Sequence, residues 1–239
     1  LATAIWLRDA GELQEATIAA KNAKTELLPG IEISCYGVRE EIHILGLGIN
    51  PETQGLPEWL EHLIKKREER LYKIIQNLSS LGINLDVDQV LTPEHTGSVG
   101  RPHIARLLVK RGYVTTIEEA FVKYLNPGTP GFVPSHRLPA QEAMHKIQEA
   151  GGCAVQAHPG AMGRDEEIPQ LVTLGLDGIE VNHPSHAPDA VKKYQGMAKE
   201  LNLLTTGGSD FHGDGAGRST RLGQCKTPPA NYERLIDLS

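Results

Sequence analysis

The chain of 239 residues carries a formal net charge of −6 and has a sequence pI near 5.9. Its length suits one large α/β domain or a domain with an insertion, and a hydrophobic share of 39% is enough for a core. The acidic balance argues against a protein that coats duplex nucleic acid by bulk charge. No apolar run approaches the roughly 18 residues of a membrane span.

The cysteines indicate the compartment. Cys35, Cys153 and Cys225 are an odd number with no close pairing and no Cys-x-x-Cys spacing. They favour buried thiols in a reducing environment over a disulfide frame or a zinc ribbon. The first residues also show no secretory signal layout. The sequence therefore predicts a cytoplasmic protein.

In chain order, the first predicted elements are one helix and two short strands. Residues 9–22 have apolar side chains at a helical spacing. Strands are expected over 27–35 and 41–47, and each places one polar side chain among branched apolar ones: Glu32 in the first and His43 in the second. A carboxylate is costly to bury at such a place unless it is paired or bound to a metal.

The pattern of apolar residues changes between residues 57 and about 131, where few strand patterns occur. A long amphipathic helix is predicted over 57–81, with its charged residues on a solvated face. Shorter helices are expected, over residues 86–91, 101–111 and 116–124. We therefore predict an all-helical insertion over 57–131 within a larger domain formed by 1–56 and 132–239.

After the insertion, strand and helix patterns alternate. Helices are predicted over 139–150, 166–174 and 188–202, and strands over 153–157, 177–181 and 201–204. Such alternation indicates a parallel sheet or barrel. In these folds the functional site gathers at the carboxyl ends of the strands.

Side chains of the kinds that ligate metal ions follow three successive strands of this series. They are His158, His183, His186, Asp210 and His212. Gly207 and Gly208 let the backbone turn after the last strand, and in an extended tip Asp210 and His212 point to the same side. The alternative is a polar loop with a capping Asp and a surface His. Together with Glu32 and His43, the set predicts a metal site.

Several short motifs of the sequence, taken together and in their order along the chain, resemble the motifs of one family. They are Pro29-Gly30-Ile31-Glu32-Ile33-Ser34, Glu41-Ile42-His43-Ile44-Leu45-Gly46, Gly100-Arg101-Pro102-His103-Ile104-Ala105, Ala157-His158-Pro159-Gly160, Gly178-Ile179-Glu180-Val181 with His183-Pro184-Ser185-His186, and Gly208-Ser209-Asp210-Phe211-His212-Gly213. They are similar to those of the PHP (polymerase and histidinol phosphatase) superfamily, and most of all to its bacterial enzymes for nucleoside 3′,5′-bisphosphates and short RNA 5′ ends. The resemblance implies a distorted (β/α)7 barrel with a helical insertion.

The resemblance also implies roles for residues. Metal ligands would be Glu32, His43, His158, Asp210 and His212, and the last three would form the catalytic group. The ions would be divalent: manganese, iron, zinc or magnesium. Such ions hold an activated water and the phosphoryl oxygens together. The reaction would be hydrolysis of phosphate monoesters or diesters of nucleotides.

Substrate-binding candidates complete the implied site. They are Arg101, His103, Ser135, His136, Arg137, His183 and His186. Arg101 is either a fork for a substrate phosphate or a helix-start arginine paired with an acid, and the predicted insertion would cap the strand ends with Arg101 facing the metals. His183 and His186 would contact substrate or carry protons. The expected partners are phosphorylated small molecules, nucleotides and short RNA, with no membrane and no duplex DNA.

One departure from the family pattern bears on activity. The His-x-His strand and the Asp-His-Asp strand that open the family's domain are not present in this chain, so its N-terminal strands are expected to be missing or altered. On that ground the chain is expected to bind fewer divalent ions than its relatives and to have weak or no phosphatase activity. Three functions stay open: a phosphoesterase, a degenerate phosphate- or nucleotide-binding module, and a metal-dependent amidohydrolase.

Overall fold

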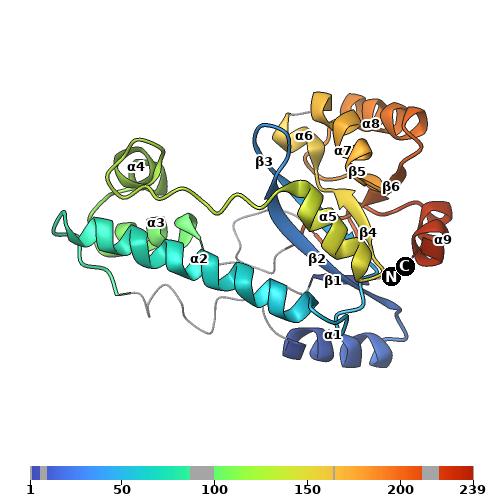
Figure 1. The fold of residues 1–239 in the computed structure, drawn as a ribbon, viewed down its shortest axis with the longest axis horizontal. Coiled ribbons are helices and arrows are strands. Elements are labelled where there is room, and N and C mark those ends of the chain that lie inside the picture. Colours follow the sequence, from blue (N-terminus) through green and yellow to red (C-terminus); the bar gives the residue numbers. More distant parts are fainter. Residues whose placement is uncertain (1, 6–9, 87–99, 164, 212–220, 239) are drawn as a thin grey trace. The chain divides into compact units, whose positions relative to one another are not determined.

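A computed structural model describes residues 2–5, 10–86, 100–163, 165–211 and 221–238. It divides into two compact units. The first, called the sheet unit, contains Leu1–Leu56 and Arg137–Ser239, and the second, called the helical unit, contains Pro57–His136. Figure 1 shows both units in ribbon form.

A mixed six-stranded sheet organises the sheet unit, with its strands in the order β1-β2-β3-β4-β5-β6. The strands are β1 (Ala2–Ile5), β2 (Leu27–Tyr36), β3 (Glu41–Leu47), β4 (Cys153–Gln156), β5 (Gly178–Asn182) and β6 (Leu204–Gly207). The pair β1–β2 and the run β4–β5–β6 are parallel, whereas β3 is antiparallel to both of its neighbours. The α/β class predicted from the sequence is therefore confirmed.

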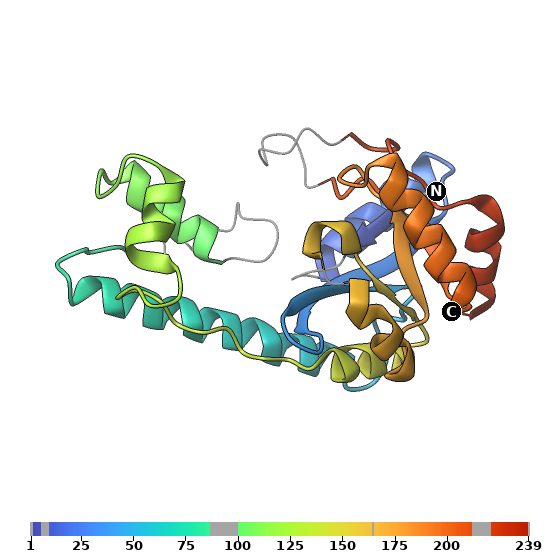
Figure 2. The same cartoon turned by 90° about the horizontal axis from the view of Figure 1, so that it is seen from above.

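Helices flank this sheet (Figures 1 and 2). They are α1 (Ala10–Asn22), α5 (Ala140–Glu149), α6 (Pro159–Met162), the 3-10 turn η3 (Asp165–Glu167), α7 (Ile168–Thr173), α8 (Pro188–Glu200) and α9 (Pro229–Leu238). Helix α5 packs on β3 so closely that a Cβ at Gly46 would lie 2.8 Å from Cγ1 of Ile147. Glycine is therefore required there for the helix to cover this outer face of the sheet.

The opposite face, called the inner face, carries both an apolar floor and polar groups. Register pairs Glu32 with Leu45, Leu45 with Val155, and Val155 with Gly178, so these positions share one face. Because side chains alternate along a strand, His43 and Glu180 lie on it too. The floor is a buried cluster of Leu28, Leu47, Cys153, Val155, Leu204 and Leu235, with Leu45 packed against it.

Most predicted elements of the sheet unit match the structure. Strand β1 and helices α6 and α9 were not expected. The strand expected at 201–204 is wrong over its first three residues, because α8 runs to Glu200 and its end is closed by Leu201 and by Asn202 at φ 54°. Strand β6 instead uses Leu204 and the β-branched Thr205 and Thr206. The apolar run was therefore a helix end that leads into a strand.

The helical unit has its own core. Its helices are α2 (Leu56–Ser79), α3 (Arg101–Lys110), α4 (Ile117–Ala120) and the π-helix η2 (Phe121–Leu125). Helix α2 begins at Leu56, one residue before the first residue of this unit. Leu71, Ile74, Ile75 and Leu78 recur at helical spacing on α2 and pack with buried residues of α3, including Ile104. The helix expected at 86–91 falls almost wholly outside the described residues. Among the helices that are described, none is long and apolar enough to cross a membrane.

Candidate metal centre

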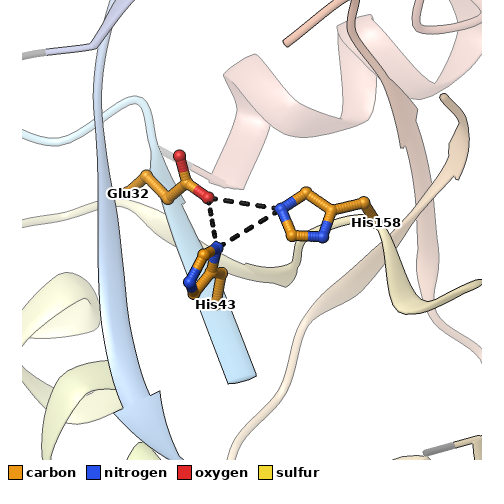
Figure 3. A group of neighbouring side chains, drawn as sticks. All are labelled: Glu32, His43 and His158. Carbon is orange, nitrogen blue, oxygen red and sulfur yellow. Dashed lines mark hydrogen bonds and ion pairs between the residues drawn. The ribbon is translucent and has the colours of Figure 1, made fainter. Parts of the chain in front are cut away.

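Three side chains from three strands meet on the inner face (Figure 3). Glu32 comes from β2, His43 from β3, and His158 from the turn after β4. Oε1 of Glu32 lies 2.8 Å from Nδ1 of His43 and 3.4 Å from Nε2 of His158, and the two ring nitrogens are 3.3 Å apart. Within the described part of the chain, these atoms form a group of potential metal ligands.

The donor set fits a divalent ion. One carboxylate and two imidazoles are a set used by catalytic zinc sites, which keep a further position open. Ligand atoms about 2.0–2.1 Å from a tetrahedral ion are separated from one another by about 3.4 Å. Two of the three separations in this triad, 3.3 and 3.4 Å, match that value. The triad therefore has the chemistry of three ligands of one ion, and two of its three separations already have the spacing that such ligands need.

Electrostatics of the triad also favour a cation. Burial alone would raise the pKa of Glu32, but hydrogen bonds from His158 and His43 outweigh it and hold the pKa well below its ordinary value. Burial acts to lower the pKa of His158, yet the carboxylate of Glu32, helped by Glu180 and Asp210, raises it. The ionised carboxylate thus attracts a positive charge to this point, which either protons or a metal ion can supply.

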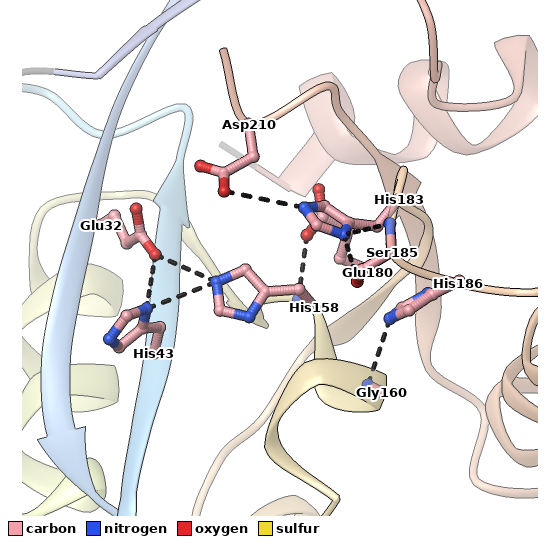
Figure 4. A network of polar contacts seen from close by, with 9 residues as sticks. All are labelled: Glu32, His43, His158, Gly160, Glu180, His183, Ser185, His186 and Asp210. Atoms are coloured by element: carbon pink, nitrogen blue, oxygen red, sulfur yellow. Dashed lines mark hydrogen bonds and ion pairs between the residues drawn. The ribbon is translucent and has the colours of Figure 1, made fainter. Parts of the chain in front are cut away.

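Asp210 and His183 lie beside the triad (Figure 4). Oδ2 of Asp210 is 3.8 Å from Nε2 of His183, and the rings of His183 and His158 are 5.3 Å apart. Asp210 has φ 49°, so the loop after β6 is not the extended tip expected from the sequence. His212 lies outside the described residues, and its place relative to Asp210 remains the prediction made above.

The tautomer of His183 follows from its hydrogen bonds. Its Nδ1 accepts from the backbone N–H of Ser185 at 3.1 Å and lies 2.7 Å from the hydroxyl of the same residue. In the neutral ring the proton is therefore on Nε2, which faces Asp210. His186, in contrast, donates from Nδ1 to the carbonyl of Val181 and accepts at Nε2 from the N–H of Gly160.

Glu180 is a site residue to which the sequence argument assigned no role. It is 5% exposed on the inner face of β5, and one of its oxygens accepts from the backbone N–H of His158 at 2.9 Å. Burial raises its pKa, against the opposing effect of that hydrogen bond and of the nearby histidines. The signal that could have found it is the one that singled out Glu32, a lone carboxylate within an apolar strand.

Two substrate-binding candidates have local roles in the helical unit. Nη1 of Arg101 donates to the carbonyl of Leu125 at 3.1 Å, and the guanidinium lies over the rings of Phe121 and Phe132. Nδ1 of His103 accepts from the N–H of Gly100 at 3.1 Å, which closes the first turn of α3. Both side chains therefore stabilise the fold of their own unit.

The remaining candidates lie on the segment between η2 and α5. Ser135 is half-buried, and His136 and Arg137 are exposed. The guanidinium of Arg137 sits over the ring of Tyr36, 5.0 Å from its centroid. This cation–π contact ties the segment to the end of β2.

Comparison with known proteins gives clear relatives, although no family model matches. The chain is 36% identical over 213 residues to a 3′,5′-nucleoside bisphosphate phosphatase of Chromobacterium violaceum, covering 87% of this chain and 75% of that protein. It is 30% identical over 200 residues to the 5′-3′ exoribonuclease Rnm of Escherichia coli, covering 82% and 68%.

Two solved structures share the fold. One is a crystal structure from Bifidobacterium adolescentis assigned to a metal-dependent phosphoesterase, with a TM-score of 0.81 and 27% identity over 97% of this chain and 83% of that chain. The other is an amidohydrolase from Chromobacterium violaceum with bound sulfate and no metal, with a TM-score of 0.75 and 33% identity over 95% and 82%.

The strand-end site and these similarities define a metal-dependent phosphoesterase, a class of hydrolase. The chain belongs to the bacterial family that includes the 3′,5′-nucleoside bisphosphate phosphatase and the 5′-3′ exoribonuclease Rnm. The resemblance to PHP phosphoesterases stated from the sequence is thereby confirmed.

Proposed function

We propose that the chain hydrolyses phosphate esters of nucleotides, namely nucleoside 3′,5′-bisphosphates and the 5′ ends of short RNA, at the site that contains Glu32, His43 and His158. The observation that carries the proposal is the convergence of these three ligand-type side chains from β2, β3 and the end of β4. The activities named for the relatives supply the substrate class.

The chain's own groups would divide the work. Glu32, His43 and His158 would hold a divalent ion, which supplies an activated water and neutralises phosphoryl charge when bound. Asp210, and His212 by its place in the sequence, would extend the ligand set. His183 presents an Nε2–H next to Asp210, a suitable donor for the proton that the leaving oxygen needs. Arg101, His103, Ser135, His136 and Arg137 remain candidates for the substrate side.

The finer features of the family complete the proposal. The mixed sheet would be part of a distorted (β/α)7 barrel, with residues 57–131 as its helical insertion. The ion would be manganese, iron, zinc or magnesium, since mixed imidazole and carboxylate ligands accept several of these metals. The enzyme would act in the cytoplasm, as its unpaired cysteines suggest.

Phosphate release tests the proposal. Adenosine 3′,5′-bisphosphate and a short 5′-phosphorylated RNA are supplied to the protein after chelation and again after addition of each metal. We expect turnover that requires a divalent ion and is lost in His158→Ala. Metal-independent turnover, or equal activity of His158→Ala, would contradict the proposed site.

An amidohydrolase is the second candidate, favoured by the name of one solved structure with 33% identity. Amide and lactone substrates, assayed with the same metals, separate the two functions. Hydrolysis of these substrates without release of phosphate from the nucleotides would establish the second candidate in place of the first.

A further inference from the structure

The turn that follows β4 is held in an uncommon backbone conformation. His158 has φ 28°, a positive value that side-chain-bearing residues rarely adopt. Strain of this kind persists only where the surrounding structure determines it. Since His158 is a proposed metal ligand, the groups that fix this turn also fix the direction of its imidazole.

The ring of His158 has no such support of its own. Metal-binding histidines usually donate their second ring nitrogen to a carboxylate or carbonyl, which orients the ring. Nδ1 of His158 is buried and has no hydrogen-bond partner among the residues that the structure describes. Apart from the contacts of Nε2 with Glu32 and His43, the direction of the ring therefore depends on the backbone at His158, Pro159 and Gly160.

Two side chains from one region hold that backbone (Figure 4). Glu180, on β5, accepts from the N–H of His158 at 2.9 Å. His186, in the turn after β5, accepts from the N–H of Gly160 at 3.1 Å while its other ring nitrogen is fixed by the carbonyl of Val181 at 2.8 Å. The turn is thus bound at both ends.

Packing makes the outer contact specific. A Cβ at Gly160 would lie 2.7 Å from Cδ2 of His186 and 3.3 Å from the hydroxyl of Tyr194, so a side chain there would push the ring away. The ring of His186 is backed by that of Tyr194, with centroids 5.0 Å apart, and the Tyr194 hydroxyl donates to Asp165 at 2.8 Å. The imidazole is therefore confined on its far side as well.

We infer that Glu180 and His186 are positioning residues that hold the His158–Gly160 turn from β5 and thereby direct the His158 imidazole toward Glu32 and His43. This assigns His186 a role that differs from the substrate contact expected from the sequence, because both of its ring nitrogens are used by the backbone. The inference rests on the proposed metal site for its consequence, which is the affinity for the ion.

Cobalt titration followed by visible absorption and calorimetry tests the consequence without turnover. His186→Phe keeps a ring but loses both hydrogen bonds, Glu180→Ala loses the inner acceptor, and Gly160→Ala displaces His186 with no loss of a polar group. Each should weaken cobalt binding by about 10–100-fold, the usual effect of removing such support. Glu180→Gln keeps an acceptor and should restore most of the affinity. His145→Phe, at an exposed histidine of α5, is the matched control and should bind as the parent chain does.

Crystal structures of the metal-free variants provide a second readout. In His186→Phe and Glu180→Ala, Nε2 of His158 should move away from Oε1 of Glu32, from which it lies 3.4 Å in the parent chain. An unmoved ring, or cobalt affinity unchanged in both variants, would overturn the inference. A ring that moves in a protein whose cobalt binding is indifferent to His158→Ala would support the inference and overturn the proposed metal site instead.

Discussion

Polar side chains that belong to motifs of the family make different kinds of contact in the sheet unit and in the helical unit. On the inner face of the sheet, Glu32, His43 and His158 direct their polar atoms at one another. In the helical unit, Arg101 and His103 direct theirs at the backbone of that unit. The first arrangement leaves charge to be neutralised by an ion, whereas in the second each side chain makes a hydrogen bond to a neutral backbone group.

This difference shows why a sequence word alone does not give a role. A side chain within a family motif can serve the fold of its own unit, as His103 does where its Nδ1 accepts from the backbone N–H of Gly100. A histidine or carboxylate that faces other titratable groups can have a perturbed pKa, and such groups are candidates for a functional site. Each prediction below sharpens this contrast or breaks it.

The largest effect is expected from loss of the Glu32 charge. Glu32→Gln removes the carboxylate that draws a cation to the triad, so we expect nucleotide phosphate release to fall at least about a hundredfold. Release of phosphate at saturating metal measures it. Glu52→Gln, an exposed carboxylate on the same unit, is the matched control. Similar losses in both variants would show that the contrast is not specific to the triad.

Arg101→Ala tests the other side of the comparison. Loss of the hydrogen bond to Leu125 and of the ring contacts should lower the free energy of unfolding by about 1–2 kcal/mol, as measured by urea denaturation. A phosphate contact, as expected from the sequence, would in addition raise KM for a bisphosphate more than for a small aryl phosphate. Lower stability with equal KM effects would leave Arg101 only its local role.

The pH dependence of stability should reveal the coupled triad in the chelated protein. The pKa of Glu32 is lowered from 4.5, so its stabilising contribution is present above that value and is lost as pH falls. The pKa of His158 is raised from 6.5, so its contribution is present below that value and is lost as pH rises through the folded-state pKa.

The two contributions therefore overlap between roughly pH 4.5 and 6.5. Urea unfolding across this range should show the excess stability of the parent chain over Glu32→Gln, and the excess should shrink on both sides. An excess that is independent of pH would mean that the three side chains do not interact as charges.

The smallest effect concerns the thiols and separates two buried cysteines from a partly buried one. Burial raises the pKa of Cys35 to about 12 and that of Cys153 to about 11, so both stay protonated and unreactive at pH 8. Cys225 is only partly buried, although burial also raises its pKa. Iodoacetamide labelling followed by mass spectrometry should therefore modify Cys225 first. Early labelling of Cys153 would show that the apolar floor opens readily.

Much of the fold could be predicted because its signals are local. Alternating strand and helix patterns predicted α5, β4, α7, β5 and α8, and the loss of that pattern marked the helices after Pro57. The antiparallel pairing of β3 with β4 could not be predicted, because it joins residues more than a hundred positions apart. The end of α8 was misjudged, since a helix terminus and a short strand share the same run of leucines.

The sequence predicted which residues belong to the site better than it predicted the contacts between them. Glu32 and His43 were singled out as polar residues within apolar strands and His158 as a metal-ligating type of residue at a strand end, and the structure brings the three together. The use of His186 and Glu180 by the backbone of His158 and Gly160 was not foreseen, because it depends on the path of a turn and on no local pattern. These hydrogen bonds can be recognised only when the positions of β5 and of the turns after β4 and β5 are known.

Anomalous diffraction tests the central claim most directly. Crystals of the full chain soaked in manganese or zinc and measured at the metal edge should give a peak bonded to Oε1 of Glu32, Nδ1 of His43 and Nε2 of His158. The peak should disappear in His158→Ala crystals of the same form. Bound metal located away from these three atoms, or a peak that persists unchanged in His158→Ala, would contradict the account.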